Sequence, residues 1–277
     1  MVNPEIEASA LLASAHKIIV FAGAGMSADI GVQPYWTGDD KKYGSEKSAE
    51  GFTDYEHAHA SLWETDRAAQ IRHFNSTLKT LTGNDVLGEE SPYKLLLDYF
   101  RGQHKDYFIT TSNVDGAFVR AGFAADKIFE VHGSRMRSQC LDYPHRHGVF
   151  PTDLISGTPT LCPSCAGDTR PNTFGFWDFD FNAKESTAQR IRFQIFRETA
   201  DLAHTVGLVI GAGTTVPTIH DQALMTNLAY AIPLIRINPV VSPQHLLAEQ
   251  VFNFEPAAPI IDIPKPAFKG IQEIIAF

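Results

Sequence analysis

The sequence is poor in cysteine and has no long apolar run. Three cysteines among 277 residues are too few, and an odd number, for a disulfide framework, so we expect a reducing compartment. No apolar run approaches the ~18 residues that a membrane span needs. The start of the chain, Met1 to Glu5, lacks the basic and apolar regions of a signal peptide. We therefore expect a cytoplasmic protein with no membrane partner.

The sequence also lacks an excess of positive charge. Lys and Arg number 23 against 32 Asp and Glu, which gives a net charge of -9 at pH 7. Nucleic-acid affinity rests largely on clustered Lys and Arg, so nucleic acid is not an expected partner. No low-complexity tract is present, and the 44% of hydrophobic residues suffices for a sizeable core.

What the sequence does contain is a series of short apolar runs separated by helical patterns. The runs at 17–21, 107–111, 206–210 and 234–237 each lead into Gly, Ser, Asn or Asp. Helical patterns cover 5–16, 93–102 and 187–204, and Ser91-Pro92 is a suitable cap and first turn for the second of these. This alternation predicts an α/β fold with a mainly parallel, doubly wound sheet of about six strands and a ligand at its carboxyl edge.

A glycine-rich loop follows the first predicted strand. Gly23-Ala24-Gly25-Met26-Ser27 would let the backbone approach a pyrophosphate, with a helix N-terminus supplying N–H donors. The alternative is a tight turn that binds nothing. The loop departs from the dehydrogenase fingerprint because no third glycine stands at the expected spacing and no clear acidic residue ends a second strand. Hydride transfer is therefore not the first choice.

Seven short motifs occur in a fixed order along nearly the whole chain. They are Gly-Ala-Gly-Met-Ser at 23–27, Thr-Ser-Asn-Val-Asp at 111–115, Val-His-Gly at 131–133, Cys-Pro-Ser-Cys at 162–165, Arg-Pro-Asn at 170–172, Gly-Ala-Gly-Thr at 211–214 and Ile-Asn at 237–238. Together they resemble the sirtuin family. The resemblance implies a Rossmann-like fold and cleavage of the nicotinamide–ribose bond of the co-substrate NAD.

The resemblance also divides the chain into two domains. Residues 1–33, 91–134 and 184–277 would form the Rossmann-like NAD-binding domain. Residues 34–90, in which 55–81 carry a helical pattern, and the loop-rich module 135–183, which contains all three cysteines, would together form the small domain.

The family's functional residues match particular positions here. The resemblance implies that His132 deprotonates a ribose hydroxyl, which suits a group that titrates near neutral pH, that Asp115 binds the carboxamide of nicotinamide, and that Asn113 orders the ribose and a water. Asn113 and Asp115 could instead merely cap the next helix. The implied NAD contacts are Gly23, Ala24, Gly25, Ser27, Tyr35, Ser112, Gly211, Thr214, Thr215 and Asn238.

The chain departs from the family at three places near this site. Residues 32–36 read Val-Gln-Pro-Tyr-Trp where the family has Ile-Pro-Asp-Phe-Arg, Ser112 replaces a Gln, and Trp177 replaces a Gly in the segment that binds acyl-lysine peptides by strand addition. Features around 113–123 look like the macrodomain-linked sirtuins, which act as protein ADP-ribosyltransferases. That branch tends to lack the catalytic His, whereas this chain keeps His132.

Structural zinc in the family uses two Cys-x-x-Cys pairs. Here the second pair, Cys162 and Cys165, is intact, and the first retains only Cys140. His145 or His147 could complete a Cys3His site of ordinary zinc chemistry. The alternative is a module without metal, held by packing with reduced cysteines.

We therefore expect an NAD-dependent protein deacylase that acts on an acylated protein. One alternative is a mono-ADP-ribosyltransferase or NAD hydrolase that uses the same pocket. A second alternative is an NAD-sensing module without turnover, which the missing Arg and the presence of Trp177 would favour.

Overall fold

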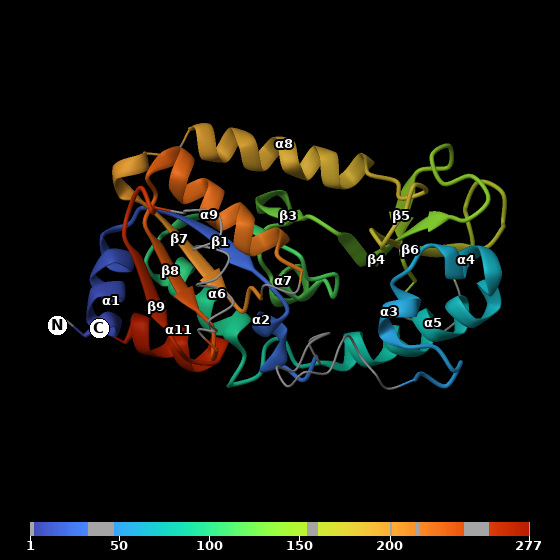
Figure 1. The fold of residues 1–277 in the computed structure, drawn as a ribbon, viewed down its shortest axis with the longest axis horizontal. Coiled ribbons are helices and arrows are strands. Elements are labelled where there is room, and N and C mark those ends of the chain that lie inside the picture. The colour runs from blue at the N-terminus through green and yellow to red at the C-terminus, as the bar shows by residue number, and fades with distance from the viewer. Residues whose placement is uncertain are drawn as a thin grey trace.

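The computed structural model describes residues 3–32, 47–153, 160–199, 201–213, 216–240 and 255–276. A six-stranded sheet forms the larger part of the molecule (Figure 1). Its strands stand in the order β3-β2-β1-β7-β8-β9, and all neighbouring pairs are parallel. The strands are β1 (Lys17–Ala22), β2 (Asp106–Thr111), β3 (Ile128–Glu130), β7 (Thr205–Ile210), β8 (Leu234–Ile237) and β9 (Ile260–Ile263).

The strand order reverses between β1 and β7, which is the topological switch point of a doubly wound sheet. The predicted parallel, doubly wound sheet is thus confirmed. Ligands of such sheets bind outside the carboxyl ends of the strands at this point, so the fold itself places the candidate site there.

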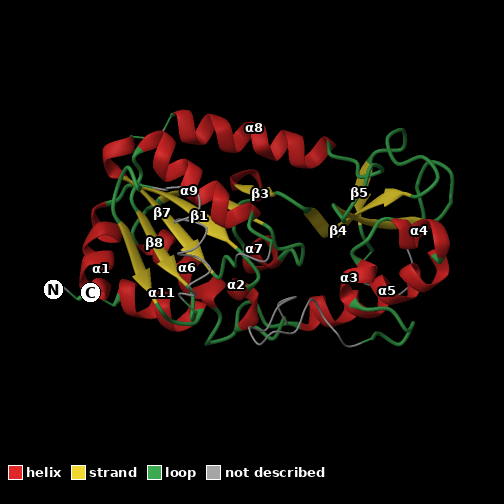
Figure 2. Ribbon diagram, viewed as in Figure 1, coloured by secondary structure: helices red, strands yellow, loops and turns green. Residues whose placement is uncertain are grey.

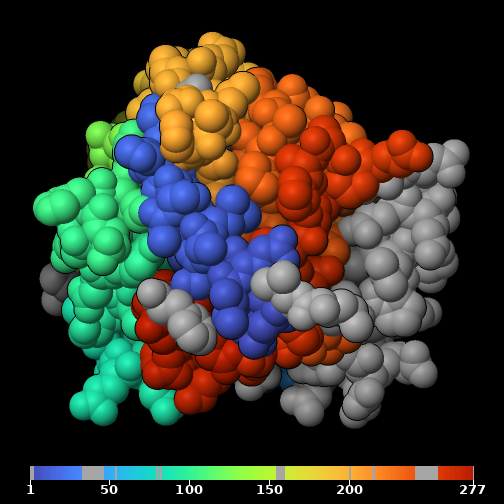
Figure 3. Space-filling model, turned by 90° about the vertical axis from the view of Figure 1, so that its left-hand side faces the viewer, coloured from blue at the N-terminus to red at the C-terminus, as the bar shows by residue number. Residues whose placement is uncertain are grey.

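Helices cover both faces of the sheet, so its strands are buried on both sides. On β1, Ile18 and Val20 join one apolar cluster while Ile19 and Phe21 join the other. The first cluster lies under α1 (Pro4–Ser14), α6 (Pro92–Gly102), α7 (Ala117–Ala121) and α11 (Ala267–Ile275), and the second under α8 (Lys184–Glu198) and α9 (Thr218–Tyr230) (Figures 1 and 2). Figure 3 shows the end of the molecule at which α1, in blue, lies against α11, in red.

Two predicted helix ends can be compared with the structure. Ser91 accepts a hydrogen bond from the backbone N–H of Lys94 at 3.4 Å, and Pro92 opens α6, as the sequence predicts. The helix predicted over 187–204 is wrong at its C-terminal end, because α8 stops at Glu198. There the Thr199 hydroxyl donates to the carbonyl of Ile195, a local bond that competes with helix continuation.

A second, smaller sheet forms the core of the other part of the molecule. It contains β4 (Gly133–Cys140), β5 (Val149–Pro151) and β6 (Thr169–Thr173), which pair antiparallel in the order β5-β4-β6. Three helices accompany it: α3 (Asp54–His57), α4 (Ser61–Thr65) and α5 (Arg67–Gly83). The division into two domains at the residues given above stays a prediction.

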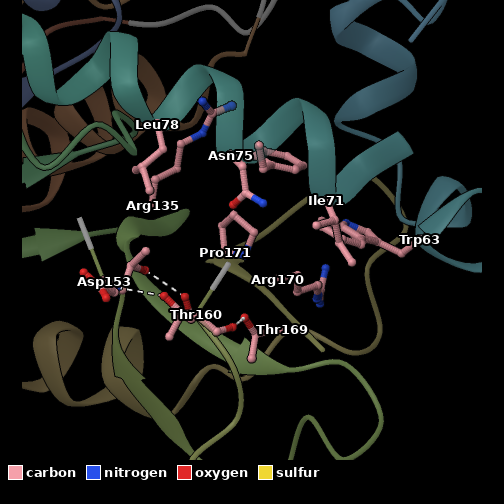
Figure 4. Close-up of a pocket in the computed structure, with 13 residues that line it drawn as sticks. Trp63, Ile71, Asn75, Leu78, Arg135, Asp153, Thr160, Thr169, Arg170 and Pro171 are labelled. Atoms are coloured by element: carbon pink, nitrogen blue, oxygen red, sulfur yellow. Dashed lines mark hydrogen bonds between the residues drawn. The ribbon is translucent and has the colours of Figure 1, made fainter. Parts of the chain in front are cut away.

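A narrow cleft separates α5 from the small sheet (Figure 4). Ile71, Asn75 and Leu78 line it from α5, and Thr169 and Pro171 line it from β6. The face of α5 that carries positions 71, 75 and 78 is thereby turned toward the sheet. Within the described ranges, no helix is long and apolar enough to cross a membrane.

Candidate active site

The polar residues predicted to act lie together at the carboxyl ends of neighbouring strands. Gly23 follows β1, Asn113 follows β2 and Gly211 follows β7. The Asn113 side chain donates a hydrogen bond to the carbonyl oxygen of Gly23 at 3.0 Å, and the Gly25 N–H donates to the carbonyl of Gly211 at 3.0 Å. Three segments that are far apart in the sequence are therefore joined in one crevice.

The glycines of this crevice are required by the contact between two loops. A Cβ on Gly25 would lie 2.7 Å from the Cα of Gly211, and a Cβ on Gly211 would lie 2.4 Å from the backbone of Gly25. Gly211 also has φ +58°, a conformation that L side chains rarely adopt. The sequence predicted these glycines for close approach to a pyrophosphate, and the structure shows that they first allow two loop backbones to touch.

Ser27 lies at the centre of a buried hydrogen-bond network. It stands in the short helix α2 (Gly25–Ala28), which follows the glycine loop directly. Its hydroxyl donates to Asp115 Oδ2 at 2.6 Å and accepts from Asn113 Nδ2 at 3.0 Å. The Tyr93 hydroxyl lies 2.6 Å from the Ser27 oxygen. Ser27, Tyr93 and Asp115 are each at most 5% exposed, so these bonds form in a medium that strengthens them.

The direction of each hydrogen bond in the network follows from the donors that are present. Since Ser27 gives its only proton to the Asp115 carboxylate, the Tyr93 hydroxyl must donate to Ser27. Burial, and next the charge of Asp115, raise the pKa of Tyr93 well above its usual value, so this proton stays in place. The sequence analysis missed Tyr93 because a tyrosine on the apolar face of an amphipathic helix is typical of a core residue.

Asp115 also caps the helix that follows it, which was the alternative to a role in NAD binding. Its Oδ1 accepts a hydrogen bond from the Ala117 N–H at 2.9 Å, at the start of α7. One carboxylate oxygen of Asp115 therefore caps α7, while the other accepts the hydrogen bond from Ser27.

His132 lies directly after β3, near the first residue of α9. Its Nε2 is 3.5 Å from the hydroxyl oxygen of Thr218. Burial lowers the pKa of His132 below its usual value, and a hydrogen bond with the Ser112 backbone opposes this shift without cancelling it. The imidazole is therefore neutral at pH 7, which is the form that a general base needs. Thr218 had no recognisable signal in the sequence.

Asn238 lies at the carboxyl end of β8, beside the loop after β7. Its side chain donates to the carbonyl of Ala212 at 3.1 Å. Both residues line a small open hollow, together with His220 and Asp262. Three other predicted NAD contacts, Tyr35, Thr214 and Thr215, lie outside the described residues.

The segment after β6 is already paired along one edge. The Phe176 N–H donates to the carbonyl of Ala58 at 2.8 Å, and the Phe176 carbonyl accepts from the Ala60 N–H at 3.0 Å. The next residue, Trp177, has φ +57° and a side chain that is 73% exposed. This edge of the segment has no backbone groups left at Phe176 for an added strand.

The three cysteines converge with one histidine in the small sheet module. The sulfurs of Cys140 and Cys165 are 3.7 Å apart, and the Cys162 sulfur is 3.3 Å from His147 Nδ1. The four ligand atoms all lie within 4.8 Å of one another, and His145 is outside the group. Zn–S bonds of about 2.3 Å and Zn–N bonds of about 2.0 Å fit such a set after a small contraction. The residues therefore suit a tetrahedral zinc ion.

The thiol of Cys162 is already disposed to ionise. Burial acts to raise its pKa, but backbone N–H groups of Ser164 and Cys165, together with the side chains of Cys165 and His147, outweigh burial and bring the pKa to about 6. A thiolate is the form in which cysteine binds metal, so this position is ready to act as a ligand at neutral pH.

Comparison with known proteins gives consistent matches. The profile of the Sir2 family matches residues 23–210. The NAD-dependent protein deacylase 2 of Pseudomonas aeruginosa is 25% identical to this chain, over 82% of the chain and 83% of the relative. The NAD-dependent protein deacylase 2 of Pyrobaculum aerophilum is 30% identical over 60% of the chain and 61% of the relative.

Solved structures share the fold at lower identity. A Sir2 homolog in complex with NAD matches with a TM-score of 0.65 at 16% identity, over 98% of this chain and 92% of that one. A Sir2 enzyme bound to a propionylated peptide matches with a TM-score of 0.64, also at 16% identity, over 96% and 95% of the two chains.

Proposed function

The chain belongs to the Sir2 family, and on this premise we propose that it is an NAD-dependent protein deacylase. It cleaves the nicotinamide–ribose bond of NAD and transfers ADP-ribose to the acyl group of an acylated lysine. The observation that carries the proposal is the buried Ser27–Asn113–Asp115 network at the switch point of the sheet, with His132 at the end of the neighbouring strand.

The first step develops positive charge on the ribose, so a negative group fixed nearby lowers its barrier. Asp115 supplies that charge, and its carboxylate is held by Ser27 and the Ala117 N–H. The carboxylate accepts a hydrogen bond from the carboxamide of nicotinamide, and Asn113 orients the ribose. The acyl oxygen attacks C1 of the ribose as nicotinamide leaves with the electron pair of the broken bond.

The second step needs a base. Neutral His132 takes the proton of a ribose hydroxyl, whose oxygen then attacks the carbon of the acyl group. Thr218, whose hydroxyl lies 3.5 Å from Nε2, helps to hold the ring. The backbone of Gly23, Ala24 and Gly25 would approach the pyrophosphate of NAD. Ser112 would be a further contact in the NAD site, and Gly211 and Asn238 would contact the adenosine half.

Zinc has a structural part in this proposal. Cys140, His147, Cys162 and Cys165 would hold the ion, which would crosslink β4 to the loop before β6 and take no part in the reaction. Closed sites with four protein ligands are typical of structural zinc.

The pairing of Phe176 favours a second candidate, a mono-ADP-ribosyltransferase or NAD hydrolase. A peptide that binds by strand addition needs free backbone groups, and those of Phe176 are bound to Ala58 and Ala60. Trp177 stands next to this edge with an exposed indole. An acceptor other than a strand of acylated peptide would not need these groups.

Product analysis separates the candidates. Purified protein is incubated with NAD and acetylated, longer-acylated or lipoylated peptides, and nicotinamide, O-acyl-ADP-ribose and protein-bound ADP-ribose are measured by mass spectrometry. A deacylase yields O-acyl-ADP-ribose, and the second candidate yields protein-bound or free ADP-ribose. His132→Ala abolishes deacylation and preserves nicotinamide release. NAD binding without nicotinamide from any acceptor would leave only an NAD-sensing module.

We further propose a cytoplasmic location without a nucleic-acid partner. The net charge of -9 supports the absence of a nucleic-acid partner, and the three cysteines outside any disulfide support the reducing compartment.

A further inference from the structure

A second cluster of ligand-type side chains lies in the helical part of the small module. It comprises His57 at the end of α3, His73 in the middle of α5, and Glu50 in the segment before α3. One ligand atom from each lies within 4.8 Å of the other two. No family motif predicts this group, because its members are separated in sequence and have no characteristic spacing.

The protonation of His57 is fixed by Gln70. The Gln70 Nε2 donates to the carbonyl oxygen of His57 at 3.0 Å, so the Oε1 of the same amide faces His57 Nδ1 at 2.7 Å. An amide oxygen can only accept, and Nδ1 therefore carries the proton. The lone pair of His57 is left on Nε2, which accepts a hydrogen bond from the Ser48 hydroxyl at 2.8 Å.

This arrangement is the one that metal-binding histidines show. Such a histidine usually donates its non-ligating N–H to a carbonyl or carboxylate oxygen, which sets the tautomer and the direction of the ring. For His57 the accepting oxygen is Oε1 of Gln70, which is fully buried. The Ser48 hydroxyl occupies the direction in which a cation would bind.

His73 is the second ligand and has no polar partner for its ring. Its side chain belongs to a residue only 6% exposed, yet within the described ranges neither ring nitrogen forms a hydrogen bond. Burial, and next the proximity of His57 and Arg135, lower the pKa of His73 to about 3, so the ring stays neutral and keeps a lone pair.

The two rings are stacked, with centroids 3.5 Å apart and an angle of 8° between their planes. Two nitrogen ligands of one zinc ion lie ~3.3 Å apart, given Zn–N bonds of about 2.0–2.1 Å in a tetrahedral site. In such a site the two ring centres lie about 5 Å apart, so the stacked rings of His57 and His73 must separate and tilt when the ion binds.

We propose that Glu50, His57 and His73 form a binding site for a divalent transition-metal ion, separate from the Cys140–His147–Cys162–Cys165 cluster. Two imidazoles and one carboxylate suit Zn²⁺, Cu²⁺ or Ni²⁺, whereas Mg²⁺ and Ca²⁺ prefer oxygen ligands. The ion would tie the segment before α3 to α5, and the site does not depend on the proposed enzymatic function.

Zinc stoichiometry and coordination test this site without any activity measurement. Wild-type protein and variants are dialysed against buffered Zn²⁺, and bound zinc is measured by plasma mass spectrometry. We expect two ions per chain in the wild type. His73→Phe, which keeps an aromatic ring in the stack, should bind one. Glu50→Gln, an isosteric change at a partly exposed position, should weaken the second ion at least about tenfold.

A matched control and X-ray absorption make the test independent of folding defects. His59→Asn alters a partly exposed histidine of the same module, whose Nδ1 lies 2.8 Å from the Ser61 hydroxyl, and should leave both ions bound. The average number of sulfur ligands per zinc should be higher in His73→Phe than in the wild type, because only the cysteine cluster remains loaded. One ion per chain in the wild type at saturation, or a second ion that persists in both His73→Phe and Glu50→Gln, would overturn the proposal.

Discussion

The polar side chains in the crevice of the large sheet and those in the ligand clusters of the small module have different kinds of partner. In the crevice, Ser27, Asn113 and Asp115 are bonded to one another or to backbone groups. In the small module, the cysteine sulfurs and the ring of His73 face other ligand-type atoms instead. The difference indicates that the crevice is preorganised by the protein alone, while the small module needs ions to reach its final form.

Loss of the cysteine site should give the largest effect if this contrast holds. In Cys162→Ser, one of four ligands becomes a poor one, and the free energy of unfolding should fall by several kcal/mol, on the order of part of the zinc-binding energy. Thermal unfolding followed by circular dichroism measures the change, and zinc analysis should show its loss. Chelation of the wild-type protein should have the same effect.

Ser164→Ala is the matched control for this change, because Ser164 lies in the same loop with an exposed side chain. It should retain zinc and stability. If Cys162→Ser unfolded at the temperature of the wild type, the small module would be held by packing, and the contrast would fail.

Asp115→Asn should separate chemistry from stability on the other side of the comparison. The amide oxygen can still accept the bond from Ala117, but the negative charge is gone. We expect the rate of nicotinamide release to fall by about 100- to 1,000-fold, as for loss of one preorganised electrostatic group, with a small change in thermal stability. Asp126→Asn, at an exposed carboxylate, should have the rate of the wild type. A large drop in stability with unchanged kcat would contradict the assignment.

Tyr93→Phe should lower kcat for nicotinamide release by a smaller factor. The change measures how much the network depends on the Tyr93 hydroxyl. The ring and its edge contact with Phe118 remain, while Ser27 loses one donor. A lost hydrogen bond of about 0.5–1.5 kcal/mol corresponds to roughly a 2- to 13-fold fall in kcat for nicotinamide release.

The same helix offers Tyr99→Phe as the control for Tyr93→Phe, since Tyr99 is only partly buried and packs beside Phe100. It should leave kcat unchanged. Should Tyr93→Phe change only thermal stability, with kcat and KM for NAD as in the wild type, Tyr93 would be a core residue and no more.

The smallest effect expected is on the pH dependence of deacylation, compared with that of a reaction that uses an ordinary histidine. Burial lowers the pKa of His132 below 6.5, so the neutral, basic form persists further into acid than for an ordinary histidine. As the pH falls, kcat/KM should decline only below 6.5, and it should be level from there to neutral pH. An acid limb centred above 6.5 would show that the ring is more solvated than its burial indicates.

The sequence predicted the parts of the fold that carry strong local signals. The runs at 17–21 and 107–111 became β1 and β2 with one residue added at one end of each. The short strand β9, of four residues, was not singled out, because so few residues give no clear periodicity. The strand β6 begins within a stretch expected to be rich in loops, and β4 was not predicted. Ser, Arg, Asn and Thr dominate both strands, and their burial comes from tertiary packing.

The candidate site was predictable only where a motif carried it. Ser27, Asn113 and Asp115 belong to motifs and lie together. Tyr93 reaches the same network from a helix that begins 64 residues after α2 ends. The stacking of His57 on His73 depends on how α3 packs on α5, which no local pattern records. Residues brought in by packing therefore stayed invisible to sequence analysis.

The contact between Gly25 and Gly211 has a mechanical consequence. A Cβ at either glycine would clash with the backbone of the other loop, so the two loops are packed in direct backbone contact. A shift of the loop after β1 must displace the loop after β7, so the two ends of a dinucleotide bound across them would sense each other through the backbone. The two positions are therefore constrained together in evolution. A side chain at either one requires the backbone of the other loop to move away.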